Sequence, residues 1–193
     1  MKTLSELCNQ HQTDKGTEKI YWDQDPPHKY SLVYEKYLEN LREEKINLLE
    51  LGLFWRGENK HLRAVEKGPR SLYVWRDYFK FANIYGLDII DGEKFSEERI
   101  KVMKINATKS EELVRLFKKC DSFDIIIDDA SHIIEQTLSS FKLLYPKLKS
   151  GGFYFIEDIP DKRLDRELAQ NFGVEVERFK MEDHYSGLVL IKK

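Results

Sequence analysis

The stretch FDIIIDDASH, residues 123–132, combines an apolar strand with a cluster of polar groups at its end. Phe123 and three isoleucines lead to Asp128 and Asp129, and His132 follows. A short apolar run bounded by polar residues is typical of a strand buried on both faces of a sheet. Taken alone, the polar groups fit a helix cap with an exposed histidine. Whether they have a structural or a functional role depends on which residues of the other strands lie next to them.

Apolar runs and amphipathic segments alternate along the rest of the chain. Strands are expected at 46–52, 83–89, 99–105, 123–129, 152–158, 174–180 and 186–193, and helices at 30–44, 71–79, 110–120, 133–148 and 161–172. Serines at the starts of two helices are expected to act as caps, Ser71 and Ser110. Alternation of strands and helices predicts an α/β fold, a doubly wound and mostly parallel sheet of about seven strands. The last two strands have no helix between them and predict an antiparallel edge hairpin.

Length and composition favour one soluble domain. The chain has 193 residues, is 41% hydrophobic, and nearly balances 32 Lys and Arg against 34 Asp and Glu. A pI of about 6.2 argues against a nucleic-acid binder. Cys8 and Cys120 have no metal or redox spacing, which suits a reducing compartment. We find no signal peptide at the N-terminus and no apolar run long enough for a membrane span, so a cytoplasmic protein is expected.

Polar groups follow nearly every core strand. They are Glu50 and Gly52, Asp88, Asn106, Asp128 and Asp129, and Glu157 and Asp158. Ligands bind at the carboxyl ends of the strands in such sheets. Asp88 stands where nucleotide-binding sheets place a carboxylate for ribose, although a polar turn explains it equally well. Glu50 lies inside an apolar run, which indicates either a functional group or a structural ion pair.

The acidic residues after two strands indicate a cation site. If the strands ending at Asp129 and at Glu157 and Asp158 are neighbours, their backbones lie about 4.8 Å apart. Carboxylates so close repel one another unless a cation or protons compensate. Oxygen ligands suit magnesium better than zinc, and His132 is near enough in sequence to act as a general base. A helix cap, an exposed histidine and a solvated turn are the alternative reading.

Several motifs, in this order, resemble class I S-adenosylmethionine-dependent methyltransferases. They are TDKGT (13–17), HKYSLVYEKYL (28–38), LLELG (48–52), SLYVWRDYF (71–79), IYGLDI (84–89), FDIIIDDASH (123–132) and GGFYFIEDI (151–159). The resemblance is greatest to the macrolide and antibiotic sugar O-methyltransferases, a group often named together with cephalosporin-hydroxylase-like proteins. It extends from Thr13 to about Ile159, and the pairing of DDASH with GGFYFIED is its most specific part.

The resemblance implies a role for each candidate site residue. Asp129, Glu157 and Asp158 look like the ligands of a magnesium or similar divalent cation. His132 looks like the catalytic base, with Asp129 beside it. The S-adenosylmethionine site implied by the resemblance consists of Glu50, Gly52, Asp88, Asn106, Asp128, Lys15 and Gly16. Thr13, His28 and Tyr30 match an N-terminal segment that closes over the substrate in relatives.

One departure from the family pattern is an insertion, Phe54–Arg70, before the helix at 71–79. It could form a lid, an oligomer contact or only a solvated loop, and it weakens the expectation that Gly52 and Gly57 contact a ligand. We expect one methyltransferase domain, 1–193, with an N-terminal helical lid segment at 1–45 and a Rossmann-like core at 46–193. No auxiliary N-terminal domain is expected.

The sequence therefore predicts a metal-assisted O-methyltransferase that uses S-adenosylmethionine and acts on a hydroxyl of a sugar-containing small molecule. No nucleic-acid or membrane partner is expected, and homo-oligomer formation is left open. A metal-dependent hydrolase using the same carboxylates is an alternative, as is a non-catalytic binding or assembly protein on the same fold. A dinucleotide oxidoreductase is disfavoured because the G-x-G-x-x-G fingerprint is missing.

Overall fold

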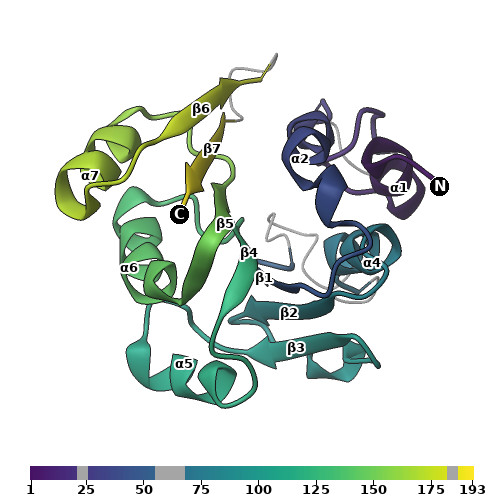
Figure 1. The fold of residues 1–193 in the computed structure, drawn as a ribbon, viewed down its shortest axis with the longest axis horizontal. Coiled ribbons are helices and arrows are strands. Elements are labelled where there is room, and N and C mark those ends of the chain that lie inside the picture. The colour runs from purple at the N-terminus through teal and green to yellow at the C-terminus, as the bar shows by residue number, and fades with distance from the viewer. Residues whose placement is uncertain (21–25, 55–67, 182–186) are drawn as a thin grey trace.

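A computed structural model describes residues 1–20, 26–54, 68–181 and 187–193. Its centre is a seven-stranded sheet in the order β3-β2-β1-β4-β5-β7-β6 (Figure 1). The strands are β1 (Asn47–Leu51), β2 (Asn83–Asp88), β3 (Ile100–Lys104), β4 (Phe123–Asp128), β5 (Leu148–Ile156), β6 (Glu177–Lys180) and β7 (Gly187–Lys192). Each of the seven expected strands is present.

The topology confirms the doubly wound α/β fold. Strands β3, β2, β1, β4 and β5 pair in parallel, whereas β7 pairs antiparallel with both β5 and β6. The chain leaves β1 toward β2 and β3 on one side and returns to β4 on the other, so β1 and β4 form the switch point of the sheet. Ligands bind beside such a point, at the carboxyl ends of the strands.

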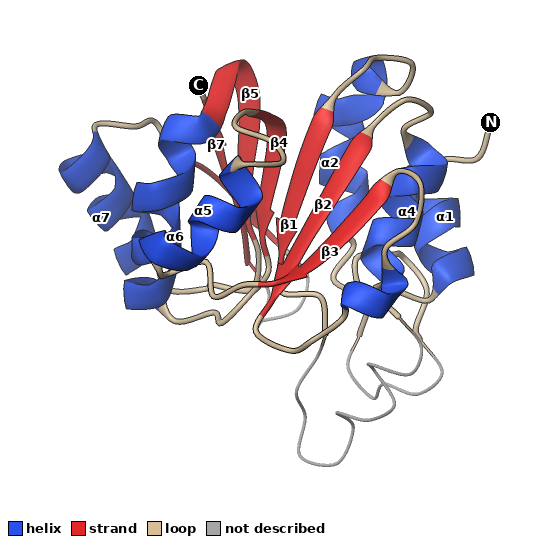
Figure 2. Cartoon of the chain, turned by 90° about the horizontal axis from the view of Figure 1, so that it is seen from below, coloured by secondary structure: helices blue, strands red, loops and turns tan. Residues whose placement is uncertain are grey.

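Helices cover both faces of the sheet (Figure 2). They are α1 (Leu4–His11), α2 (Tyr30–Leu38), α4 (Arg70–Tyr78), α5 (Ser110–Phe117), α6 (Ile134–Leu144) and α7 (Arg163–Phe172). Short 3-10 turns follow at η1 (Glu39–Leu41), η2 (Glu93–Phe95) and η3 (Tyr145–Lys147). Helices α1, α2 and α4 bury Leu7, Tyr34 and Trp75 against one face, and α5, α6 and α7 bury Leu116, Phe141 and Leu168 against the other.

Helix α1 is absent from our sequence expectations. Its apolar face is short, with Leu4, Leu7 and Cys8 buried, and the segment reads as polar. The sequence nevertheless contains a capping box. In the structure, the Thr3 side chain accepts a hydrogen bond from the Glu6 amide, and the Glu6 side chain accepts one from the Thr3 amide. Helix α1 belongs to the layer of α1, α2 and α4 on one face of the sheet, and the N-terminal segment that reaches the site is part of this layer.

Three local predictions are wrong. The helix expected at 30–44 ends at Leu38 and continues as the η1 turn. The caps expected at Ser71 and Ser110 are not formed, because α4 begins after Pro69 and α5 after Lys109, neither with a side-chain cap bond.

The lid or oligomer role considered for the insertion falls mainly on residues 55–67, outside the described part of the chain. Among the described residues, no helix is long and apolar enough to cross a membrane.

Candidate active site

The ends of β1, β4 and β5 are held together by backbone hydrogen bonds. The Asp129 amide donates to the Leu51 carbonyl at 3.0 Å, and the Glu157 amide donates to the Asp128 carbonyl at 2.9 Å. The three strands therefore continue as a ladder one residue beyond their formal ends. This extension places the acidic residues of β4 and β5 next to the loop after β1.

Gly52 allows these loops to approach closely. Its φ is +79°, and a Cβ at this position would lie 1.9 Å from the Asp129 carbonyl oxygen. A side chain is excluded both by the left-handed backbone and by this contact. Gly52 therefore serves first to pack the β1 loop against the β4 loop.

A cavity of about 830 Å³ opens at this edge of the sheet. Its lining includes four of the residues expected at the cofactor, Gly52, Asp88, Asn106 and Asp128. It also includes the acid and histidine residues Asp129, His132 and Asp158, with Thr13 and Lys15 from the N-terminal segment. One continuous space thus joins the expected cofactor side to the expected reaction side.

Asp88 organises the wall on the cofactor side. Its Oδ2 accepts hydrogen bonds from the Leu53 amide at 2.8 Å and the Phe54 amide at 3.1 Å. Its Oδ1 accepts from the Ile90 amide at 2.8 Å. The carboxylate fixes the loop after β1 and keeps about one acceptor site available for a hydroxyl, since an ionised carboxylate has about four such sites.

The other two polar groups on this side are also held in place. Asp128 Oδ2 accepts from the Ser140 hydroxyl at 2.6 Å, and burial raises the pKa of Asp128 to about 6. Asn106 Oδ1 accepts from the amide and hydroxyl of Thr108 at 3.0 and 2.8 Å. Both side chains therefore face the cavity in fixed orientations.

Lys15, which was expected at the cofactor, lies among the carboxylates. It is 2% exposed. Its Nζ donates to Asp129 Oδ2 at 2.5 Å and Glu157 Oε2 at 2.8 Å, and lies 3.7 Å from Glu50 Oε1. Burial alone would lower the pKa of Lys15, but Asp129 and Glu157 raise it well above its ordinary value. The ammonium is thus firmly charged at neutral pH.

Glu157 and Glu50 form the buried, inner part of the cluster. Besides Lys15, Glu157 accepts a hydrogen bond from the Tyr34 hydroxyl at 2.5 Å, and Glu50 accepts from Trp75 Nε1 at 2.8 Å. Burial raises the pKa of both acids, and Lys15 opposes that rise. Sequence reasoning missed Tyr34 and Trp75, although Tyr34 lies one helical turn after Tyr30.

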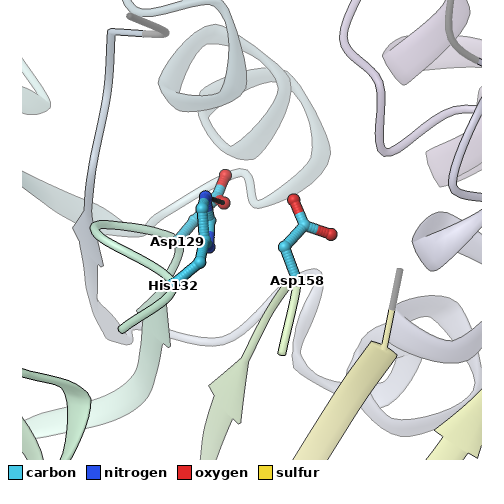
Figure 3. A group of neighbouring side chains, drawn as sticks. All are labelled: Asp129, His132 and Asp158. Carbon is cyan, nitrogen blue, oxygen red and sulfur yellow. Dashed lines mark ion pairs between the residues drawn. The ribbon is translucent and has the colours of Figure 1, made fainter. Parts of the chain in front are cut away.

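Asp129, His132 and Asp158 form the outer part of the cluster (Figure 3). One ligand atom from each lies within 4.8 Å of the others, and His132 Nε2 is 3.9 Å from Asp129 Oδ1. His132 and Asp158 both have φ of 55°. Left-handed backbone is uncommon outside glycine and concentrates at functional sites.

The remaining predicted residues support this arrangement from outside the cavity lining. Tyr30 donates from its hydroxyl to Asp158 Oδ1 at 2.5 Å, and His28 Nδ1 lies 3.3 Å from the same oxygen. A Cβ on Gly16 would lie 2.4 Å from Asn9 Oδ1, so Gly16 packs against α1. His28, Tyr30 and Gly16 therefore position the N-terminal segment.

The donor set fits a divalent cation. Among the described residues, Asp129, His132 and Asp158 offer ligand atoms within 4.8 Å of one another, a group that does not include the predicted ligand Glu157. Lys15 is a single ammonium that pairs with three carboxylates, those of Glu50, Asp129 and Glu157. Burial raises the pKa of Asp129 to about 7, against the opposing effect of Lys15. An added cation would relieve this excess of negative charge, and carboxylate oxygens suit magnesium.

Comparisons with known proteins find similar methyltransferases. No protein-family model matches the chain. Over 156 residues it is 35% identical to mycinamicin VI 2''-O-methyltransferase from Micromonospora griseorubida and 35% identical to demethylmacrocin O-methyltransferase from Streptomyces fradiae. Each match covers 81% of this chain and 36% of the relative, so the chain matches about a third of their length.

A solved structure is similar over the whole chain. The mycinamycin-pathway methyltransferase MycE, in complex with Mg and S-adenosylhomocysteine, superposes with a TM-score of 0.74 at 27% identity. The match covers 100% of this chain and 55% of MycE. MycE has also been solved with mycinamycin VI bound. The chain is therefore similar over 81% of its length to macrolide and sugar O-methyltransferases, and it has the Rossmann-like fold of S-adenosylmethionine-dependent methyltransferases.

Proposed function

We propose that this chain catalyses S-adenosylmethionine-dependent, divalent-cation-assisted O-methylation of a hydroxyl on a sugar-containing small molecule. The observation that carries the proposal is the shared cavity. Asp88, Asn106 and Asp128 line one side of it, and the Asp129, His132 and Asp158 cluster lines the other. A methyl donor and a hydroxyl acceptor need this arrangement, because the reacting atoms must meet in line.

The cofactor side is proposed to bind the donor. S-adenosylmethionine supplies a methyl group on a positively charged sulfur. Asp88 would accept a hydrogen bond from a ribose hydroxyl, and Asn106 would lie beside the adenine. Asp128 would face the methionine end, where a carboxylate held by Ser140 complements an amino group.

Asp129, Glu157 and Asp158 are the proposed ligands of the cation. When bound, a divalent cation lowers the pKa of a hydroxyl group and fixes its position. His132 is the proposed general base, since its Nε2 lies beside Asp129 and its side chain is 40% exposed. The imidazole can take the hydroxyl proton on the cavity side and release it to water. General bases typically contribute about 10²–10⁴-fold to the rate.

The N-terminal segment is proposed to complete the acceptor side. Thr13 and Lys15 line the cavity. The Tyr30 hydroxyl donates a hydrogen bond to Asp158, and His28 Nδ1 lies 3.3 Å from the same carboxylate. On this proposal residues 1–193 act as one methyltransferase domain in the cytoplasm, with a small-molecule acceptor.

Calorimetric titration with S-adenosylhomocysteine tests the donor site without knowledge of the acceptor. Wild type is expected to bind it, and Asp88→Asn is expected to bind about tenfold more weakly, the loss of one charge-assisted hydrogen bond. The matched control is Asp91→Asn, an exposed acid in the same loop. No binding by wild type would contradict the proposal and favour a metal-dependent hydrolase.

A further inference from the structure

Lys15 brings a positive charge from the N-terminal segment into the acid cluster. It lies in the loop between α1 and α2, yet its ammonium contacts carboxylates that follow or belong to three different strands. Burying an ammonium requires pairing with opposite charge, and Lys15 obtains it from Glu50, Asp129 and Glu157. It therefore already supplies one of the cationic charges that the cluster requires.

The hydrogen bonds of Lys15 occupy oxygens that a cation needs. Glu157 gives Oε2 to Lys15 and Oε1 to the Tyr34 hydroxyl, so both of its oxygens are engaged. Asp129 gives Oδ2 to Lys15, which leaves Oδ1 toward His132. A divalent cation that takes both Asp129 and Glu157 as ligands meets the ammonium at the same oxygens.

We propose that Lys15 sets the affinity of the acid cluster for divalent cations, because its ammonium holds Asp129 and Glu157 until a cation displaces it. The inference rests on the cation site of the proposed function, but it does not depend on methyl transfer. The repulsion between an ammonium and a divalent cation at neighbouring positions in a buried site gives the competition its strength.

Backbone contacts link this competition to the N-terminal segment. The Ser31 amide donates to the Lys15 carbonyl at 2.9 Å, the His28 amide to the Asp14 carbonyl at 2.8 Å, and the Lys29 amide to the Gly16 carbonyl at 3.0 Å. These bonds tie the residues around Lys15 to the start of α2. Withdrawal of the ammonium is therefore expected to loosen these three amides.

Calorimetric titration with Mg²⁺ tests the proposal on wild type, Lys15→Met and Lys80→Met. The control Lys80 also pairs with an acid, Glu43, but its side chain is 60% exposed. Lys15→Met is expected to bind Mg²⁺ at least tenfold more tightly than wild type, and Lys80→Met to match wild type. Equal or weaker binding by Lys15→Met overturns the proposal but leaves the cation site standing. No binding by any of the three proteins overturns both.

Hydrogen exchange of the wild type tests the proposal without a variant, which matters if Lys15→Met does not fold. Saturating Mg²⁺ is expected to speed exchange at the amides of His28, Lys29 and Ser31. The Leu49 amide in the central strand β1 serves as an internal control that should not change. Unchanged exchange at all three amides in the cation-saturated protein overturns the proposal.

Discussion

The Tyr30 hydroxyl joins two ends of the fold at the candidate site. It donates a hydrogen bond to Asp158 Oδ1 at 2.5 Å and accepts one from the Gly187 amide at 3.1 Å. Tyr30 begins α2, Asp158 follows β5, and Gly187 begins β7. One buried phenol thus fixes the outer carboxylate of the acid cluster and the antiparallel edge of the sheet.

Tyr30→Phe should destabilise the protein by about 1–3 kcal/mol, mainly the cost of leaving the buried Gly187 amide unpaired. The measurement is urea unfolding. Tyr37→Phe is the matched control, because it removes a hydroxyl that donates to Glu177 at the surface. Equal losses of stability in the two variants would show that the Tyr30 hydroxyl has no special role.

Gly52→Ala should cost at least about 2 kcal/mol more than Gly151→Ala, since overpacking typically adds about 1–3 kcal/mol. Both glycines have φ of +79°, so both variants place an alanine in left-handed backbone. A Cβ at Gly52 meets the Asp129 carbonyl, whereas a Cβ at Gly151 meets nothing within 4 Å. Thermal unfolding of the pair isolates the contact, and similar melting temperatures would contradict it.

Asp128 should make stability depend on pH. Burial raises its pKa from 3.8 to about 6, so the folded protein keeps a proton that the unfolded chain has already released. Its contribution to the free energy of unfolding therefore falls as the pH rises from about 4 to 6 and is constant above that range. Asp128→Asn removes this fall. The free energy of unfolding of the variant, relative to that of wild type, should therefore rise by up to roughly 3 kcal/mol between pH 4 and pH 7.

Denaturant unfolding of both proteins at pH 4, 5, 6 and 7 measures this difference. Asparagine can still accept from the Ala130 amide and pair with Ser140, so the comparison isolates the charge. A difference in the free energy of unfolding that stays constant over the range would show that Asp128 titrates normally.

His132→Asn should lower methyl transfer about 10²–10⁴-fold with little loss of stability, because asparagine tolerates the left-handed φ of 55° but cannot act as the base. His11→Asn removes a histidine that pairs with Asp77 away from the cavity and should keep full activity. Methyl transfer by His132→Asn at the wild-type rate would exclude the proposed base.

The sheet and its site edge were predictable because their signals are local. Each buried strand is an apolar run, and polar residues follow it directly, as Asp128 and Asp129 follow β4. Strand order then places these ends together. Helix α1 was not predicted because its apolar face is short, although the capping box of Thr3 and Glu6 indicates its start.

The pairing of Lys15 with the acids was not predictable from local pattern. Lys15 is 114 residues from Asp129 and 142 from Glu157, and no spacing rule connects them. Proximity of carboxylates was expected from the sheet, and the sequence argument then called for a cation or protons. The structure adds a lysine as a third source of compensation.

The most direct test of the proposed function is transfer of a labelled methyl group from S-adenosylmethionine to a panel of small-molecule glycosides. Wild type with Mg²⁺ is expected to methylate at least one glycoside. Chelator and the Asp129→Asn substitution are each expected to reduce that transfer at least about a hundredfold, as a loss of metal assistance predicts. Transfer to none of the glycosides, or undiminished transfer in both chelator and Asp129→Asn, would contradict it.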